Sequence, residues 1–155
     1  MLLKNSNKIV LDTCVLIRAL MNKSNNSKKD NEYVKIFNLM DANRIIIMTN
    51  HKILTEYSEQ INKKVREETI NAELGSKYLN LIRAKSVCGR ELINPPIFLS
   101  QDPKDNIFLA SENCIYANYL ITEDHHFEEA KADLIELNSK MLIVTAKEFI
   151  KIYDK

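Results

Sequence analysis

The sequence predicts an α/β domain in which helices cover both faces of a central parallel sheet, a three-layer α/β/α sandwich. Short apolar runs rich in β-branched residues alternate along the chain with longer segments whose apolar residues recur at helical spacing. The runs are apolar throughout, as is typical of parallel strands that are buried on both faces. The length of 155 residues and the hydrophobic content of 45% suit one domain with its own core, so we predict a single domain over residues 1–155.

The first half of the chain contains two strand-like runs, at 8–11 and 45–48. Residues 22–31 contain no apolar side chain and are predicted to form an exposed, mobile loop. Thr49 or Asn50 is suited to cap the helix after the second run, because a side-chain oxygen there can accept from free helix amides. The spacing of apolar residues predicts helices over 15–20, 33–40, 53–61 and about 67–85.

The second half contains two more strand-like runs, at 117–121 and 141–144. Residues 91–97 include two prolines and belong at a sheet edge or in a loop, because proline cannot donate to a sheet ladder. A helix is predicted behind the segment 102–105, and Thr145 is the predicted cap of a terminal helix. Strand and helix therefore alternate throughout, as in proteins with a parallel sheet.

The charges are distributed unevenly although the formal net charge is only +1. Residues 1–29 carry six basic groups against one acid, whereas residues 100–136 carry nine acids against two lysines. Such a division suits an anionic polymer held beside an acidic metal pocket. Solvated faces of unrelated sign are the alternative, and this holds for the basic residues between positions 60 and 90 as well.

The cysteines and the apolar runs exclude several classes of protein. The three cysteines are odd in number and form no CxxC pair, so neither a disulfide framework nor a zinc knuckle is indicated. A reducing, cytoplasmic location is the expectation. The longest aliphatic run is the segment 45–48, far shorter than the roughly 20 apolar residues of a membrane span.

Four acidic residues are placed to converge at one edge of the predicted sheet. Asp12 and Asp124 directly follow strands, Asp105 opens a helix entered from the same edge, and Glu56 lies off the apolar stripe of its helix. Clustered carboxylates repel one another unless a divalent cation neutralises them, and oxygen ligands favour Mg²⁺ or Mn²⁺ over zinc. The alternative for each aspartate is a helix or turn cap, and for Glu56 an ordinary surface charge.

Four motifs in order resemble the PIN domain family. They are Ile9-Val10-Leu11-Asp12-Thr13-Cys14-Val15-Leu16-Ile17, Leu54-Thr55-Glu56-Tyr57, Asp102-Pro103-Lys104-Asp105-Asn106-Ile107-Phe108-Leu109-Ala110 and Leu120-Ile121-Thr122-Glu123-Asp124. The resemblance extends from Lys8 to about Val144. It implies a compact α/β/α fold and a ribonuclease site that depends on Mg²⁺ or Mn²⁺.

The resemblance also assigns roles to individual residues. Asp12, Glu56, Asp105 and Asp124 match the acidic positions of the family, and Asp102 matches an additional acid found in part of it. The remaining auxiliary candidates are Thr13 and Thr122, whose hydroxyls can orient the neighbouring carboxylates, and Asn106.

Cys14 departs from the family pattern. A small polar residue is common in the family at this position, and a thiol is a poor hydrogen-bond partner. Cys14 is therefore expected either to weaken the ordering of the site or simply to pack.

The leading hypothesis is an endoribonuclease in which Asp12, Asp105, Asp124 and Glu56 hold the metal. The resemblance implies that many small members are toxins of toxin–antitoxin pairs, often homodimers inhibited by an antitoxin protein. A second reading keeps the fold as a catalytically weak or inactive module that binds RNA or protein. A third, an aspartyl phosphotransfer domain, lacks the second acid that such domains carry near the first one.

Overall fold

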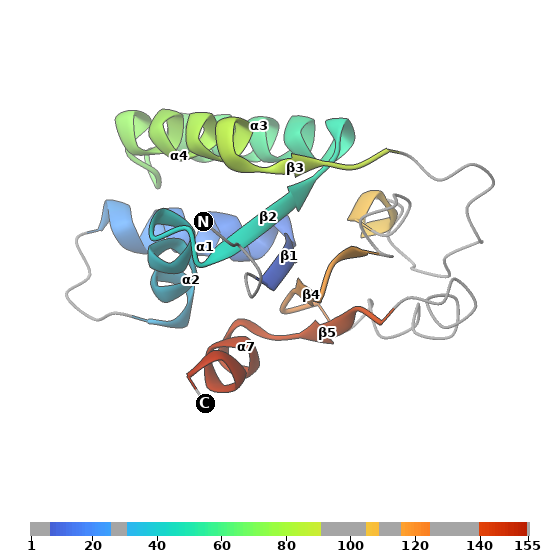
Figure 1. Ribbon diagram of the computed structural model, residues 1–155. Coiled ribbons are helices and arrows are strands. Elements are labelled where there is room, and N and C mark those ends of the chain that lie inside the picture. Colours follow the sequence, from blue (N-terminus) through green and yellow to red (C-terminus); the bar gives the residue numbers. More distant parts are fainter. Residues whose placement is uncertain (1–6, 26–30, 91–104, 109–115, 125–139, 155) are drawn as a thin grey trace.

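The computed structural model describes residues 7–25, 31–90, 105–108, 116–124 and 140–154. Its sheet has five strands in the order β3-β2-β1-β4-β5, and every neighbouring pair is parallel (Figure 1). The central strand β1 therefore has β2 and β4 as its two neighbours. The predicted fold class, an α/β/α fold with a central parallel sheet, is confirmed. The strands are β1 (Asn7–Leu11), β2 (Ile45–Thr49), β3 (Val87–Cys88), β4 (Tyr119–Ile121) and β5 (Leu142–Val144).

Both faces of the sheet are buried, which explains why the strand sequences are apolar without alternation. In β1, Ile9 and Leu11 point to one face and Val10 to the other, yet all three are fully buried. Ile9 lies opposite Ile47 on one side and Tyr119 on the other. This register brings the carboxyl ends of β1, β2 and β4 together at one edge of the sheet.

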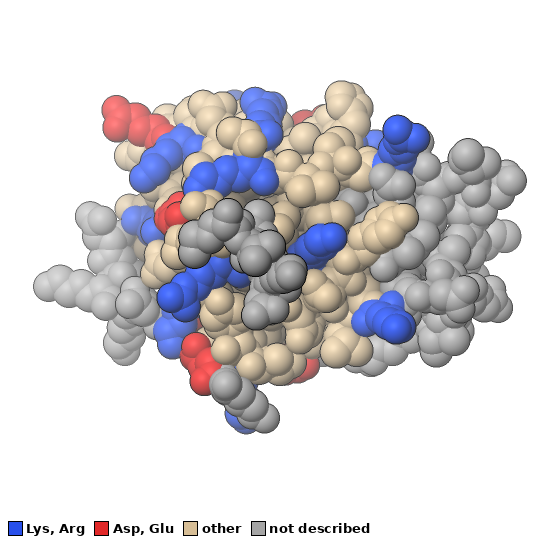
Figure 2. Space-filling model, viewed as in Figure 1, with Lys and Arg blue, Asp and Glu red and all other residues tan. Residues whose placement is uncertain are grey.

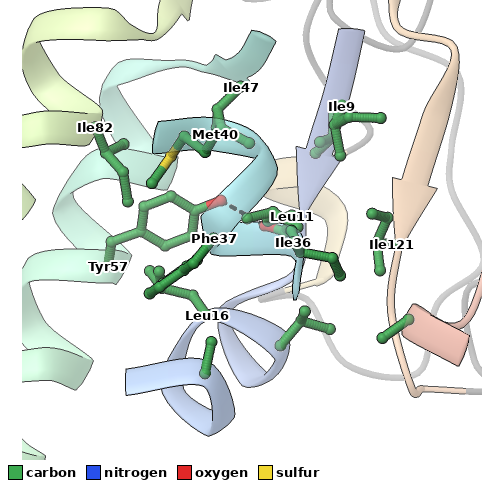
Figure 3. Close-up of a cluster of buried hydrophobic side chains, with 14 of the residues drawn as sticks. Ile9, Leu11, Leu16, Ile36, Phe37, Met40, Ile47, Tyr57, Ile82 and Ile121 are labelled. Atoms are coloured by element: carbon green, nitrogen blue, oxygen red, sulfur yellow. Dashed lines mark hydrogen bonds between the residues drawn. The ribbon is translucent and has the colours of Figure 1, made fainter. Parts of the chain in front are cut away.

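The described helices form a continuous series of neighbours in the order α7, α2, α1, α3 and α4. The helices α3 and α4 lie side by side along the top of the view in Figure 1. Figure 3 shows the core between these helices and the sheet, where Tyr57, Phe37 and Ile82 meet Leu11 and Ile47. The helices are α1 (Thr13–Ser24), α2 (Glu32–Asp41), α3 (His51–Arg66), α4 (Ala72–Lys85) and α7 (Ala146–Tyr153).

Two predicted boundaries in the first half were wrong. Residues 22–24 belong to α1 and not to a loop, while 26–30 lie outside the described residues. The fourth helix begins at Ala72 and not near Glu67, because the backbone turns left-handed at Glu68, with a φ of 61°. Asn71 then caps the new helix by accepting from the amide of Leu74.

The second half is described in part. Thr145 caps α7, as predicted, by accepting from the amide of Glu148. Asp105–Phe108 form a short 3₁₀ helix, η1, whereas 91–104 and 109–115 lie outside the described residues. The strand β3 was not predicted from the sequence. No helix in the described ranges is long and apolar enough to cross a membrane.

Candidate functional site

Buried polar side chains gather at one end of the sheet. Each belongs to a residue that ends a strand or follows it within two positions, at the carboxyl ends of β1, β2 and β4. Burying a polar group costs free energy unless it is hydrogen-bonded, so such a cluster calls for a physical explanation. In the described part of the chain, the buried polar residues are Asp12, Thr13, Thr49, Asn50 and Thr122.

Asp12 is held by a neighbouring strand and does not cap its own helix. Its side chain is 7% exposed and makes no capping hydrogen bond to the first turn of α1. Instead, the Thr122 hydroxyl donates to Asp12 Oδ2 at 2.7 Å, and the Asp12 amide donates to the Ile121 carbonyl at 3.0 Å. Asp12 therefore occupies the N-cap position of α1 without the side-chain hydrogen bond that a cap usually makes.

The electrostatic setting of Asp12 disfavours its ionised form. The pKa of Asp12 is raised from 3.8 to about 6, chiefly by burial and also by the charge of Asp124, while the Thr122 hydroxyl acts in the opposite direction. The backbone amides of Thr13 and Cys14 also lower this pKa. A cation that paired with the carboxylates of Asp12 and Asp124 would favour the ionised form of Asp12.

Thr122 links Asp12 to Asp124 through one hydroxyl. The hydroxyl donates to Asp12, as described above, and also accepts from the backbone amide of Asp124 at 3.0 Å. Asp12 and Asp124 come from strands that are adjacent in the sheet although they lie far apart in the sequence. The structure thus brings together two of the four predicted acidic residues.

Thr13 contributes an oxygen that has no partner. Its Oγ1 is buried and makes no hydrogen bond within the described chain. An orphaned hydroxyl beside a buried carboxylate lowers stability unless a bound group satisfies it. Asp12 and Asp124 themselves supply carboxylate oxygens, the ligand type that Mg²⁺ and Mn²⁺ prefer.

Asn50 ties the 3₁₀ helix that carries Asp105 to the carboxyl end of the sheet. The Asn50 Oδ1 accepts from the amide of Ile53 at 2.8 Å, and its Nδ2 donates to the carbonyl of Ile107 at 3.1 Å. Phe108 packs against Tyr57, with ring centroids 6.5 Å apart. The backbone of Asp105 therefore lies at the same edge as Asp12.

The sequence indicated Asn50 only as one of two potential helix caps and missed its long-range bond. Its position directly after a buried strand, where site residues concentrate in α/β proteins, was the available signal. The side chains of Asp105 and Asn106, and Asp102 as a whole, lie outside the described residues.

Glu56 lies on α3, partly buried, one residue before Tyr57. The Tyr57 hydroxyl donates to the carbonyl of Leu11, the last residue of β1, and so fixes this helix against the strand that precedes Asp12 (Figure 3). Among the side chains that the structure describes, no three of the acidic, histidine or cysteine type group closely enough to hold an ion. Glu56 thus does not join Asp12 and Asp124 directly in this arrangement.

Cys14 and Glu123 lie beside the site and have other roles. Burial and the charge of Asp12 raise the pKa of the Cys14 thiol. Glu123 Oε1 accepts from the amide of Ala146 at 3.1 Å, at the start of α7. The site is therefore built from oxygen groups.

Comparison with known protein families matches residues 8–126 to the PIN domain. No curated protein and no solved structure matches the chain.

Proposed function

Because the chain belongs to the PIN domain family, whose members are generally metal-dependent nucleases, we propose that it is a metal-dependent endoribonuclease. The observation that carries this proposal is Asp12, a buried carboxylate that does not cap its helix and has a second carboxylate as its electrostatic neighbour. A structural role does not explain this arrangement, because burying Asp12 beside Asp124 destabilises the ionised protein.

The residues present fit Mg²⁺ or Mn²⁺. Asp12 and Asp124 would hold the ion together with Asp105, and Glu56 would complete the shell directly or through water. A bound ion of this kind lowers the pKa of water and neutralises charge that develops on a phosphodiester. The orphaned Thr13 hydroxyl provides one more oxygen for the ion or its water ligands.

The protein's own groups prepare the site for this chemistry. The Thr122 hydroxyl stabilises the ionised form of Asp12 and fixes its orientation. The bond from Asn50 to Ile107 positions the turn that carries Asp105. Water is the proposed nucleophile, and we expect cleavage to leave a 5′-phosphate, as in the family that the chain resembles.

We further propose that the protein is the toxin of a toxin–antitoxin pair and acts in the cytoplasm, with RNA as its substrate. The support for this role is the PIN domain match over residues 8–126, because the resemblance to this family implies such a role for many of its small members. An antitoxin protein and a homodimer are the partners that this role implies. Sequencing RNA ends after induced expression, with and without the product of an adjacent small open reading frame, would test it.

The direct test of the catalytic proposal is RNA cleavage by Asp12→Asn and Asp105→Asn variants in the presence of Mn²⁺. Changing a residue that supports a metal ligand commonly costs about 10- to 100-fold, so loss of a ligand is expected to reduce cleavage by at least about a hundredfold. Asp41→Asn, which alters an exposed acid at the other end of the sheet, is the matched control. Undiminished activity in either site variant would contradict the assignment.

The second candidate function is an inactive module that binds RNA or a protein. Cys14 favours it, because the thiol cannot supply the hydrogen bonds that a polar residue would provide at this position. Calorimetry with Mn²⁺ separates the two candidates. Absence of binding at millimolar ion would support the inactive module.

A further inference from the structure

A groove lies along the open edge of the sheet, away from the acidic site. Its volume is about 380 Å³, toward the small end of the range of about 300–1,000 Å³ for ligand pockets. One wall is formed by Ile82, Lys85 and Ser86 at the end of α4. The opposite wall is the segment 45–47, the amino half of β2. We call it the amino-edge groove; its remaining lining residues are Met40, Asn43 and Val87.

The groove exists because β3 is too short to cover β2. The strand β3 pairs only with Met48 and Thr49, so the described chain places no strand beside the segment 45–47 on that side. Successive side chains of a strand point in opposite directions, yet three consecutive residues of β2 line the groove. The groove therefore runs along the backbone at the edge of this strand. An exposed strand edge is a template for pairing with another chain.

The lining of the groove is mainly aliphatic. Three isoleucines of β2 and Ile82 of α4 line it, and Val87 of β3 is 48% exposed at its rim. None of the described residues that line it has an aromatic ring on which a nucleic-acid base could stack. These properties suit aliphatic side chains of a protein segment better than RNA.

The surroundings of the groove are basic. Lys85 donates to the neutral Asn43 Oδ1 at 3.0 Å, and Arg44, directly before β2, is exposed. Within the described residues, neither of these two cations takes part in an ion pair. The nearby acid Asp41 accepts from the Tyr78 hydroxyl at 3.1 Å. Figure 2 shows Lys and Arg spread over this face.

We propose that the amino-edge groove binds an extended, acidic segment of a partner protein that adds a strand to β2. Its aliphatic side chains enter the groove, and its acidic side chains pair with Lys85 and Arg44. A second copy of this chain is a poor occupant, because a twofold interface would place the same basic residues opposite one another. The groove lies at the end of β2 opposite the acidic site, so this binding is separate from the proposed RNA cleavage.

The test is a titration of the isotope-labelled full chain, followed by NMR, with an acetylated peptide of about eight residues that alternates glutamate and valine. We expect saturable shifts of amides in β2, β3 and the end of α4, with the dissociation constant below about 1 mM. A peptide that alternates lysine and valine should bind at least about tenfold more weakly, because its charges repel the basic rim.

Two variants make the result specific. Val87→Glu is expected to weaken peptide binding at least about tenfold, and it will fold because this side chain is half exposed. Leu142→Glu, at a residue 56% exposed on the strand at the other edge of the sheet, should leave binding unchanged. Equal binding of both peptides, no saturation at millimolar peptide, or shifts centred on Asp12 would overturn the proposal. So would a dimer that Val87→Glu dissociates, because the groove would then bind a second copy.

Discussion

The two ends of the parallel sheet differ in the side chains that they bury, which are polar at one end and apolar at the other. At the carboxyl end, residues that end or follow β1, β2 and β4 bury a carboxylate, hydroxyls and an amide. At the amino end, the equivalent stretch of β2 buries isoleucines and borders an aliphatic groove. Both ends belong to the same strands, only a few residues apart.

This difference associates stability mainly with the amino end of the sheet and the proposed metal site with the carboxyl end. Apolar burial at the amino end stabilises the fold, whereas the carboxyl end contains a disfavoured charge and an orphaned hydroxyl. Groups that lower stability are retained where a ligand compensates for them. The carboxyl end is therefore expected to respond to metal ions, and the amino end is not.

The largest predicted effect is a loss of stability at the amino half of β2. Ile47 is 3% exposed and packs in the core, so Ile47→Ala is expected to lower the free energy of unfolding by about 2–5 kcal/mol. Val87→Ala, at an exposed position, should change it by less than about 0.5 kcal/mol. Denaturant unfolding measures both. An equal change in the two variants would contradict the expected difference between the buried and the exposed position. Altered Mn²⁺ affinity of the folded Ile47→Ala protein would contradict the separation of the amino end from the metal site.

Asp12→Asn is expected to raise stability when no metal is present. The folded-state pKa of Asp12 lies above its ordinary value, so the folded protein binds the proton more tightly than the unfolded chain. Stability of the parent protein should therefore fall as the pH rises from about 4 to about 6 and then level off. The pKa change of about two units corresponds to about 3 kcal/mol at most.

Unfolding of both proteins in chelator between pH 4 and pH 8 checks this expectation. The advantage of Asp12→Asn should appear above about pH 4 and remain constant above about pH 6. Added Mn²⁺ should stabilise the parent protein and not the variant, because the ion binds only the folded site. A variant that is less stable than its parent at pH 8 in chelator would show that burial of Asp12 is not unfavourable.

Thr122→Val tests the hydroxyl that links the two carboxylates. The substitution keeps the shape of the side chain and removes the donor to Asp12, so the pKa of Asp12 should rise and Mn²⁺ should bind about 10- to 100-fold more weakly. The pH at which Mn²⁺ binding is half-maximal should shift upward. Thr49→Val is the matched control, because it makes the same change at the end of the neighbouring strand β2, where the Thr49 hydroxyl shares a hydrogen bond with Ser86. Equal losses in the two variants would point to general packing instead.

The smallest predicted effect concerns Asn50. Asn50→Ser keeps a capping oxygen for α3 but removes the donor to Ile107, at a cost of about 1 kcal/mol. Asn71→Ser is the same change at a cap whose side-chain bond is local, to Leu74, and should cost only a few tenths of a kcal/mol. Mn²⁺ affinity should fall in Asn50→Ser alone, since only this variant releases the turn of Asp105. Equal affinity in both variants would remove Asn50 from the site.

Local pattern was enough to predict most of the elements. The runs at 8–11 and 45–48 and the cap at Thr145 were found because their signals lie within a few neighbouring residues. The helix start at Ala72 was missed because a left-handed residue, Glu68, interrupts an otherwise helical pattern. The strand β3 was missed because two residues are too short for any periodicity.

The sequence by itself determined the alternation of strands and helices, the family, and the placement of acids directly after strands. Only the tertiary structure decided which of those acids are electrostatically coupled. Asp12 and Thr122 are 110 residues apart, and their contact exists because β1 and β4 pair in one particular register. Tertiary packing likewise decided that, among the described strands, β3 pairs only with the last two residues of β2, because the start of β3 depends on where α4 ends. Local sequence signals extend over a few residues, whereas a parallel sheet is assembled from contacts between distant segments.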